Sequence, residues 1–273
     1  MRWTFTSDPE VYAGAAESWL LRDPVRNTVP LTMLRAVREG MWREDALMGW
    51  ATDHEEVVAA ALQAPPQLLL LAEMPTGAVR DLATALIEAE RPVPGVRGSL
   101  PLAETFAAAW WRPETGRRAE RLHRLDTLTP PPVHPDGSPR TAGTRDLEAL
   151  VEWGQAYQRE LGGHPSSGLA AVLAGRVGRR EIVLWEAAGR PVAYAGASVP
   201  IGGVSRVGPV YTLPGERGRG YGTAVAHAVT AEALERGARE VLLFTDLSNP
   251  VSNSIYRTIG YRPVADYASI LFG

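Results

Sequence analysis

A glycine-rich loop between an apolar strand and a helix constrains this chain more than any other feature. The loop reads Arg-Gly-Arg-Gly-Tyr-Gly over residues 217–222, follows the strand-like run Val204–Thr212 and opens directly into a helical pattern that ends near Arg236. Glycines let backbone N–H groups approach a ligand closely, and the first turn of a helix offers unpaired N–H groups and a partial positive charge. The order of strand, glycine loop and helix therefore predicts a mixed α/β fold with an anion site where the helix begins.

Two familiar phosphate-binding loops are excluded by the residues around this run. The dinucleotide pattern Gly-x-Gly-x-x-Gly fails because its last position, 223, is Thr. No Gly-Lys-Ser or Gly-Lys-Thr triplet occurs in the chain, so a P-loop is excluded as well. Two interpretations remain: an anion site with the spacing Arg-x-x-Gly-x-Gly, and an arginine-rich loop that only caps a helix.

Composition and charge exclude several classes of protein. The chain has 273 residues, of which 45% are hydrophobic and 22% charged, as is typical of a globular protein long enough for two domains. A net charge of −3 without a long basic stripe argues against nucleic-acid binding. The absence of cysteine excludes disulfides, thiolate zinc sites and a cysteine nucleophile. We therefore expect no metal and no covalent intermediate on a protein thiol.

The start of the chain and its apolar runs bear on location. The first residues, Met-Arg-Trp-Thr-Phe-Thr-Ser-Asp-Pro-Glu, lack the apolar core of a secretion signal. The longest apolar runs fall short of a membrane span. We expect a cytoplasmic protein without a membrane partner.

The segment Thr129–Arg140 is the clearest break in the chain. Its prolines are predicted to exclude regular structure and to make the segment a semi-rigid spacer. We therefore predict an N-terminal α/β domain over residues 1–128, a linker over 129–140 and a C-terminal domain over 141–273. The prolines are Pro130, Pro131, Pro132, Pro135 and Pro139.

Hydrophobic spacing predicts a similar order of elements in both halves. In the second half the predicted helices are Asp146–Leu161, Leu169–Val177, Tyr221–Arg236 and Pro250–Ile259, and the strands are Glu181–Ala187, Val192–Val199, Val204–Thr212 and Glu240–Thr245. In the first half we predict strands near residues 47–50, 57–63, 68–72 and 121–128, with helices through 42 and over 78–90 and 102–111. This order is compatible with the first half being a degenerate copy of the second.

A second motif lies downstream of the glycine loop. Residues 249–261 read Asn-Pro-Val-Ser-Asn-Ser-Ile-Tyr-Arg-Thr-Ile-Gly-Tyr, in which Asn precedes a helix, Tyr follows seven residues later and a Gly-aromatic pair ends the helix. With the loop at 217–222, this motif resembles the two signatures of the GNAT (Gcn5-related N-acetyltransferase) superfamily. The resemblance covers about residues 141–273 and implies an α+β domain with a central, mostly antiparallel sheet flanked by helices. Residues 1–128 lack the glycine loop, so we expect a second, degenerate GNAT-like domain without CoA binding, in a tandem arrangement.

The resemblance implies that acetyl-CoA is the co-substrate. Pantetheine would add to the backbone of Val210, Tyr211 and Thr212 like a further strand. Asn249 and Ser252 would either hydrogen-bond pantetheine or cap the last helix. The residues expected to hold the pyrophosphate are Arg217, Gly218, Arg219, Gly220, Tyr221, Gly222 and Thr223.

The resemblance indicates one candidate acid but no single candidate base. By resemblance, Tyr256 would protonate the departing thiolate, and the alternative is a packed helical aromatic. Many relatives carry a base on the strand before the loop, but Val204–Thr212 contains no carboxylate. Glu160 is therefore our candidate base, with His164 and Asp246 as alternatives.

The expected activity is direct transfer of the acetyl group of acetyl-CoA to an amine of a small molecule or peptide. The alternative is a non-catalytic acyl-CoA-binding sensor or regulatory protein, which the missing strand carboxylate permits. We expect acyl-CoA and an amine acceptor as partners of a monomer or homodimer.

Overall fold

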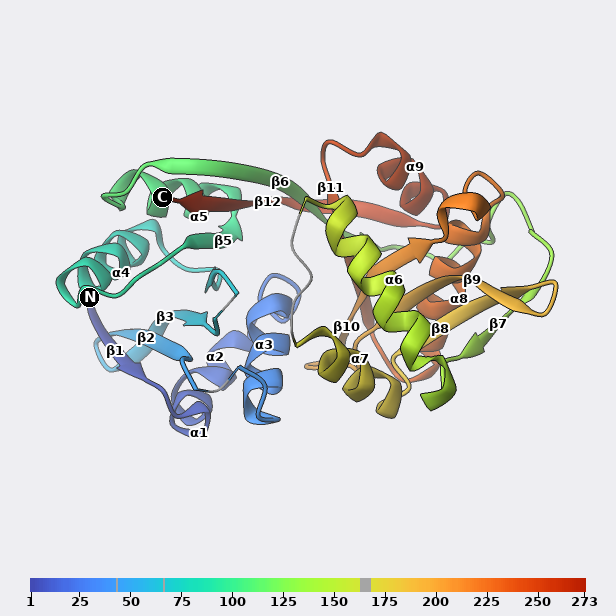
Figure 1. Ribbon diagram of the computed structural model, residues 1–273. Helices are drawn as coiled ribbons and strands as arrows, with labels where there is room; N and C mark the ends of the chain where they lie inside the picture. The colour runs from blue at the N-terminus through green and yellow to red at the C-terminus, as the bar shows by residue number, and fades with distance from the viewer. Residues whose placement is uncertain (43, 66, 163–167) are drawn as a thin grey trace. The chain divides into compact units, whose positions relative to one another are not determined.

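The computed structural model describes residues 1–42, 44–65, 67–162 and 168–273, apart from the side chains of residues 250–253 (Figure 1). Contacts divide the chain into two compact units. Unit 1 comprises Met1–Leu122, Thr245–Pro250 and Pro263–Gly273, and unit 2 comprises His123–Phe244 and Val251–Arg262. The last strand, β12 (Tyr261–Phe272), therefore belongs to unit 1 by its contacts from Pro263 onward. The domain boundaries 1–128, 129–140 and 141–273 stay a prediction.

Unit 1 combines an N-terminal helical region with a mostly antiparallel sheet. The helical region begins after β1, where the Asp8 side chain caps α1 by accepting from the N–H of Glu10 at 2.8 Å. Neighbouring strands are antiparallel from β1 to β4, β4 and β5 are parallel, and β12 is antiparallel to β5. The elements are β1 (Arg2–Thr6), α1 (Pro9–Tyr12), a π-helical turn (Ala13–Glu17), α2 (Ser18–Leu20), α3 (Thr28–Arg38), β2 (Leu47–Asp53), β3 (Glu56–Gln63), β4 (Leu69–Leu71), α4 (Thr76–Glu88), β5 (Gly95–Ser99), α5 (Leu100–Ala109) and β6 (Glu114–Leu125).

Unit 2 has the same kind of sheet. Neighbouring strands are antiparallel from β7 to β10, and β10 and β11 are parallel. The elements of this half of the chain are β7 (Ser138–Thr141), a 3₁₀ turn (Thr144–Asp146), α6 (Leu147–Glu160), α7 (Leu169–Gly178), β8 (Ile182–Ala187), β9 (Arg190–Ala197), β10 (Val204–Thr212), a 3₁₀ turn (Pro214–Glu216), α8 (Tyr221–Glu235), β11 (Glu240–Asp246), α9 (Pro250–Thr258) and β12 (Tyr261–Phe272), of which β12 belongs to unit 1 from Pro263 onward.

Both halves of the chain follow one order of elements. A first strand and helices precede three antiparallel strands, then a helix leads to a parallel strand, and another helix precedes a long last strand. Helix α4 makes the parallel connection in unit 1, and α8 makes it in unit 2. The predicted mixed α+β class with a mostly antiparallel sheet is thereby confirmed. The sequence prediction missed β1 and β5, which are strands of 5 residues each.

The prediction that the proline segment excludes regular structure is wrong at its end. Strand β7 contains Pro139, which lies opposite Trp185 of β8. The N–H of Ala142 donates to Ile182 O at 2.8 Å, and hydrogen-bonded positions alternate along an antiparallel pair, so Pro139 occupies a position that needs no N–H. An edge strand tolerates proline at such a position.

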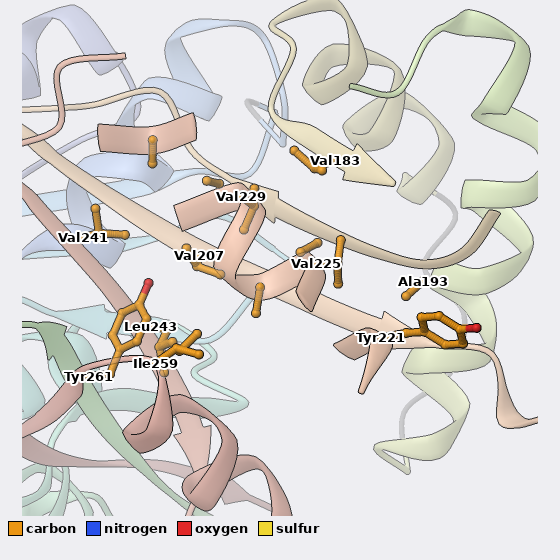
Figure 2. Close-up of a cluster of buried hydrophobic side chains, with 14 of the residues drawn as sticks. Val183, Ala193, Val207, Tyr221, Val225, Val229, Val241, Leu243, Ile259 and Tyr261 are labelled. Carbon is orange, nitrogen blue, oxygen red and sulfur yellow. The ribbon is translucent and has the colours of Figure 1, made fainter. Parts of the chain in front are cut away.

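The sheet of unit 2 buries apolar side chains on both faces. Along β8, Val183 belongs to the cluster that includes α8, whereas Ile182 and Leu184 belong to the cluster that includes α6 and α7. Successive strand residues point to opposite faces, and helices on both faces make β8 continuously apolar. Figure 2 shows the α8 cluster, whose labelled residues are Val183, Ala193, Val207, Tyr221, Val225, Val229, Val241, Leu243, Ile259 and Tyr261.

A buried ion cluster joins α7 to strand β10. The carboxylate of Glu181, which is 2% exposed, accepts from Arg176 Nε at 3.0 Å and from Arg179 Nε at 2.8 Å. Arg176 Nη1 also donates to the backbone oxygen of Gly208 in β10 at 2.8 Å. Burial acts to raise the pKa of Glu181, but the hydrogen bonds and charges of the two arginines outweigh it and hold that pKa below its usual value.

We expect Glu181→Gln to lower the unfolding free energy by about 3 kcal/mol at neutral pH, because Arg176 would stay buried without its counter-charge. Since the folded-state pKa is lowered, the carboxylate stabilises the fold fully above its unfolded pKa of about 4.3 and loses this contribution as the pH falls through the folded value. Urea titrations across acidic pH should show the difference between the two proteins shrinking. The exposed Glu235→Gln is the control, and a difference that is constant with pH would contradict the assignment.

Candidate functional site

The parallel strands β10 and β11 pair only along part of their length. Their register runs from Val204 opposite Glu240 to Val207 opposite Leu243. Beyond Val207, the described pairing of β10 continues with β9 alone and ends at Thr212. A bulge between Val207 and Val210 accompanies this change. The edge of β10 that faced β11 is therefore open over its last residues.

The backbone groups of Val210 and Thr212 point to this open edge. The N–H of Leu213 donates to Val192 O of β9 at 3.1 Å. Because hydrogen-bonded positions alternate along an antiparallel pair, Tyr211 also directs its N–H and C=O to β9. Of the three residues expected to pair with pantetheine, Val210 and Thr212 thus direct their backbone groups to the open edge, where the Thr212 oxygen already accepts from Arg217 Nε at 3.1 Å.

The glycine loop turns sharply where β10 leads into α8. Gly218 and Gly220 have φ values of +78° and +87°, a region that favours glycine. The side chain of Tyr221 is buried in the cluster of Figure 2 and anchors the start of the helix. The N–H groups of residues 221–223 have no acceptor within the helix itself. The loop therefore presents backbone N–H groups at the positive end of α8, which suits an anion.

Thr212 connects the open edge to the loop. Its Oγ1 lies 3.1 Å from the position that a Cβ of Gly222 would occupy, so strand and helix approach closely. Its backbone oxygen accepts from Arg217 Nε at 3.1 Å. The residues predicted to bind pantetheine and those predicted to bind pyrophosphate are thus adjacent.

Glu216 fixes the charge on one side of the loop. Its buried carboxylate pairs with Arg219 Nη1 at 3.0 Å and with the guanidinium of Arg190. Two cations against one anion leave a net positive charge here, and Arg219 remains 61% exposed. This arrangement adds to the positive end of α8.

The structure brings the predicted base and a predicted pyrophosphate ligand into direct contact. Arg217 Nη2 donates to both carboxylate oxygens of Glu160, at 2.7 Å and 2.8 Å. The guanidinium carbon of Arg217 lies 5.6 Å from the centroid of the Tyr211 ring, and the Tyr211 hydroxyl lies 3.5 Å from Glu160 Oε1. Burial, followed by the Glu160 charge, raises the pKa of Tyr211. The Glu160 carboxylate is therefore engaged by Arg217 in this conformation.

Tyr256, the predicted proton donor, lies in an aromatic group on α9. Its ring is partly buried and meets Tyr261 edge-on, with centroids 6.1 Å apart. Burial, with smaller effects of Tyr157 and Tyr261, raises the pKa of Tyr256. Tyr157 also meets Tyr211 edge-on at 6.2 Å. Sequence reasoning passed over Tyr157, although its place three residues before Glu160 puts the two on neighbouring positions of one helix face.

The other predicted site residues lie in or near α9, or outside the described residues. Asn249 immediately precedes α9, and its N–H donates to Asp246 O at 3.1 Å. Ser252 lies in α9, but its side chain is outside the described part. His164, an alternative base, lies outside the described residues. Asp246, the other alternative, belongs to unit 1 and accepts from Arg118 Nε at 3.0 Å.

Unit 1 has its own pair of parallel strands, β4 and β5. Beside the parallel strands β4 and β5, Leu70, Arg97 and Tyr267 line a cavity of about 10 Å³, which is room for at most one water. The Tyr267 hydroxyl donates to Arg26 O at 3.2 Å.

A larger groove of about 820 Å³ lies on another part of unit 2. It runs between the proline segment and helix α8, over Val183 and Trp185. Its lining contains none of the residues predicted for the acyl donor or for catalysis. The open edge of β10 with the loop at 217–222, rather than this groove, is the candidate site.

An open strand edge beside a glycine loop and a helix N-terminus, within an α+β sheet, places an unpaired backbone edge next to an anion site. Residues 142–261 match the model of the Acetyltransferase (GNAT) family. This part of the chain is a GNAT domain.

Solved structures show the same fold across both halves. A GNAT-family acetyltransferase from Colwellia psychrerythraea aligns over 100% of both chains with a TM-score of 0.65 and 13% identity. A GCN5-related N-acetyltransferase from Sphaerobacter thermophilus has a TM-score of 0.64 and 20% identity over 98% of this chain and 94% of its own. A tandem GNAT protein from the clavulanic acid biosynthesis pathway has a TM-score of 0.60 and 12% identity over 98% of each chain. This likeness is one of fold, and it is consistent with a second GNAT-like domain in the N-terminal half.

Curated protein sequences give no match to the chain. Across the described residues, no helix has both the length and the apolar character that crossing a membrane requires.

We expect Gly220→Asp to weaken CoA binding about tenfold or more, because its carboxylate would repel the pyrophosphate at the start of α8. Gly220→Asn is the matched control, since it has the same backbone strain at φ +87° and nearly the same size without the charge. Calorimetric titration with CoA measures both variants. Equal affinities would contradict an electrostatic anion site at this loop.

Proposed function

We propose that the protein transfers the acetyl group of acetyl-CoA directly to an amine of a small molecule or peptide. The observation that carries this proposal is the open edge of Val210 and Thr212 beside the glycine loop at the start of α8. The edge would bind pantetheine as an added strand, and the loop would bind the pyrophosphate. The GNAT domain over residues 142–261 supports acetyl-CoA as the acyl donor.

The reaction needs a neutral amine and a leaving thiolate. An alkyl amine with a pKa near 10.4 is neutral in only about one molecule in 10³ at neutral pH, which costs roughly 4 kcal/mol. The amine nitrogen attacks the thioester carbonyl carbon, the C–S bond breaks, and the new C–N bond carries the acetyl group. A base accepts the proton that the amine loses, and an acid returns a proton to the CoA sulfur.

Tyr256 is the proposed acid. A phenol carries its proton at neutral pH and can give it to the thiolate. Glu160 is the proposed base, because it lies beside Tyr211 at the open edge of β10. In the conformation described, its carboxylate is engaged by Arg217, so it would act as a base only after that contact opens.

We propose that unit 1 does not bind a second acyl donor. The loop before α4 lacks the glycines of residues 217–222. We propose a degenerate GNAT-like domain here, and a cytoplasmic monomer or homodimer for the whole protein.

One observation favours a second candidate function. Strand β10 carries no carboxylate, and the described candidates for a base are engaged by Arg217 or Arg118. A non-catalytic acyl-CoA sensor would have this arrangement. Following free thiol while the protein is incubated with acetyl-CoA and a panel of amines separates the two functions. Acyl-CoA binding without turnover on any amine would favour the sensor, and no binding would contradict both.

We expect Tyr256→Phe to lower kcat about a hundredfold with little change in the Kd for CoA, because it removes the proton donor and keeps the ring. Thiol release and calorimetry measure the two quantities. Tyr12→Phe is the control, since it removes a buried hydroxyl from unit 1. Unchanged turnover would return Tyr256 to a packing role.

A further inference from the structure

We infer that Glu160 is an internal counter-ion that occupies the anion site of Arg217 until the pyrophosphate of the acyl donor displaces it. Donor binding would thereby release the Glu160 carboxylate beside the open edge of β10. This inference rests on the proposed donor site. It adds a link between pyrophosphate binding at Arg217 and the release of the proposed base, Glu160.

The contact has the geometry of an anion site. Both oxygens of Glu160 accept from Arg217 Nη2, at 2.7 Å and 2.8 Å, while Arg217 Nε is held by Thr212 O. The Tyr211 ring supports the guanidinium from one side. A guanidinium binds carboxylate and phosphate oxygens with the same set of N–H groups. The Glu160 carboxylate therefore stands where a phosphate oxygen could bind.

The place of this contact links it to the loop. Arg217 is the first residue of the run 217–222, and its partner Thr212 also lies against Gly222 in the first turn of α8. An anion at the start of α8 would thus be within reach of a guanidinium already fixed at its Nε.

The pair is suited to exchange rather than to permanent stabilisation. The side chains of Arg217 and Glu160 are 47% and 42% exposed. An ion pair with this exposure contributes little to stability, so a diphosphate can replace the carboxylate at small cost. By contrast, the carboxylate of Glu216, which pairs with Arg219, is only 9% exposed.

Displacement has a consequence for the proposed base. With Arg217 transferred to the pyrophosphate, both oxygens of Glu160 become available next to the Tyr211 hydroxyl, which lies at 3.5 Å. Glu160 would then accept a proton only when the acyl donor is bound. A carboxylate on β10 would not be required.

Calorimetric titration of CoA into the full-length protein tests the exchange. We expect Glu160→Gln to bind CoA about twofold to fivefold more tightly, because the pyrophosphate no longer competes with a carboxylate for Arg217. Glu152→Gln, an exposed position on the same helix, removes the same charge away from Arg217 and should leave the affinity unchanged. Equal affinities of the two variants and the unmodified protein would overturn the inference.

The same substitution in an Arg217→Gln protein separates competition for Arg217 from simple repulsion between Glu160 and the pyrophosphate. In Arg217→Gln, which should itself bind CoA more weakly, adding Glu160→Gln should give no further gain. If the gain persists there, Glu160 acts by repulsion and the exchange is refuted. Pantetheine, which lacks the pyrophosphate, should bind Glu160→Gln and the unmodified protein equally, and a gain with pantetheine would also refute it. Failure of the unmodified protein to bind CoA would instead overturn the proposed function, and the inference with it.

Discussion

The bulge in β10 is the constraint on which the candidate site depends. In a regular strand Val207 and Tyr211, four residues apart, would face the same side of the sheet. The extra residue places Val207 in the cluster of α8 and Tyr211 in the cluster of α6 and α7. At the same point the pairing with β11 ends, which leaves the backbone of Val210 and Thr212 at an open edge. One irregularity therefore creates the edge and turns Tyr211 toward Glu160.

The bulge also needs support from the interior. A residue inserted into a ladder leaves backbone groups without strand partners, and buried groups of this kind must be satisfied elsewhere. Arg176 supplies a hydrogen bond to Gly208 O, and Glu181 neutralises Arg176. Burying such an ion cluster costs desolvation free energy. Its value here is to hold β10 in the shape that the site requires.

The charges around the loop are arranged in two ways. Glu216 is buried and pairs with Arg190 and Arg219, whereas Glu160 is half exposed and pairs with Arg217. The candidate anion site therefore combines backbone N–H groups at the start of α8 with nearby arginines that already have carboxylate partners. In the inferred exchange, an acyl donor would replace Glu160 at Arg217.

The sequence determined those features that depend on local order. The glycine loop, the helix after it and the motif over residues 249–261 are continuous in the chain, and α6, α7, α8 and α9 begin and end within a few residues of their predicted bounds. The fold class and the GNAT resemblance followed from these patterns. The sequence also placed Glu160 at the end of a helix without indicating what it would contact.

Only the tertiary structure decided the contacts between distant residues. Glu160 meets Arg217 across 57 positions, Tyr157 meets Tyr211 edge-on, and Pro139 fits a strand because of the position it takes opposite β8. The bulge in β10 is a matter of register between strands, which no local pattern of residues specifies. Such features are set by how helices and strands pack against one another, because packing fixes which side chains share a space and which backbone groups stay unpaired.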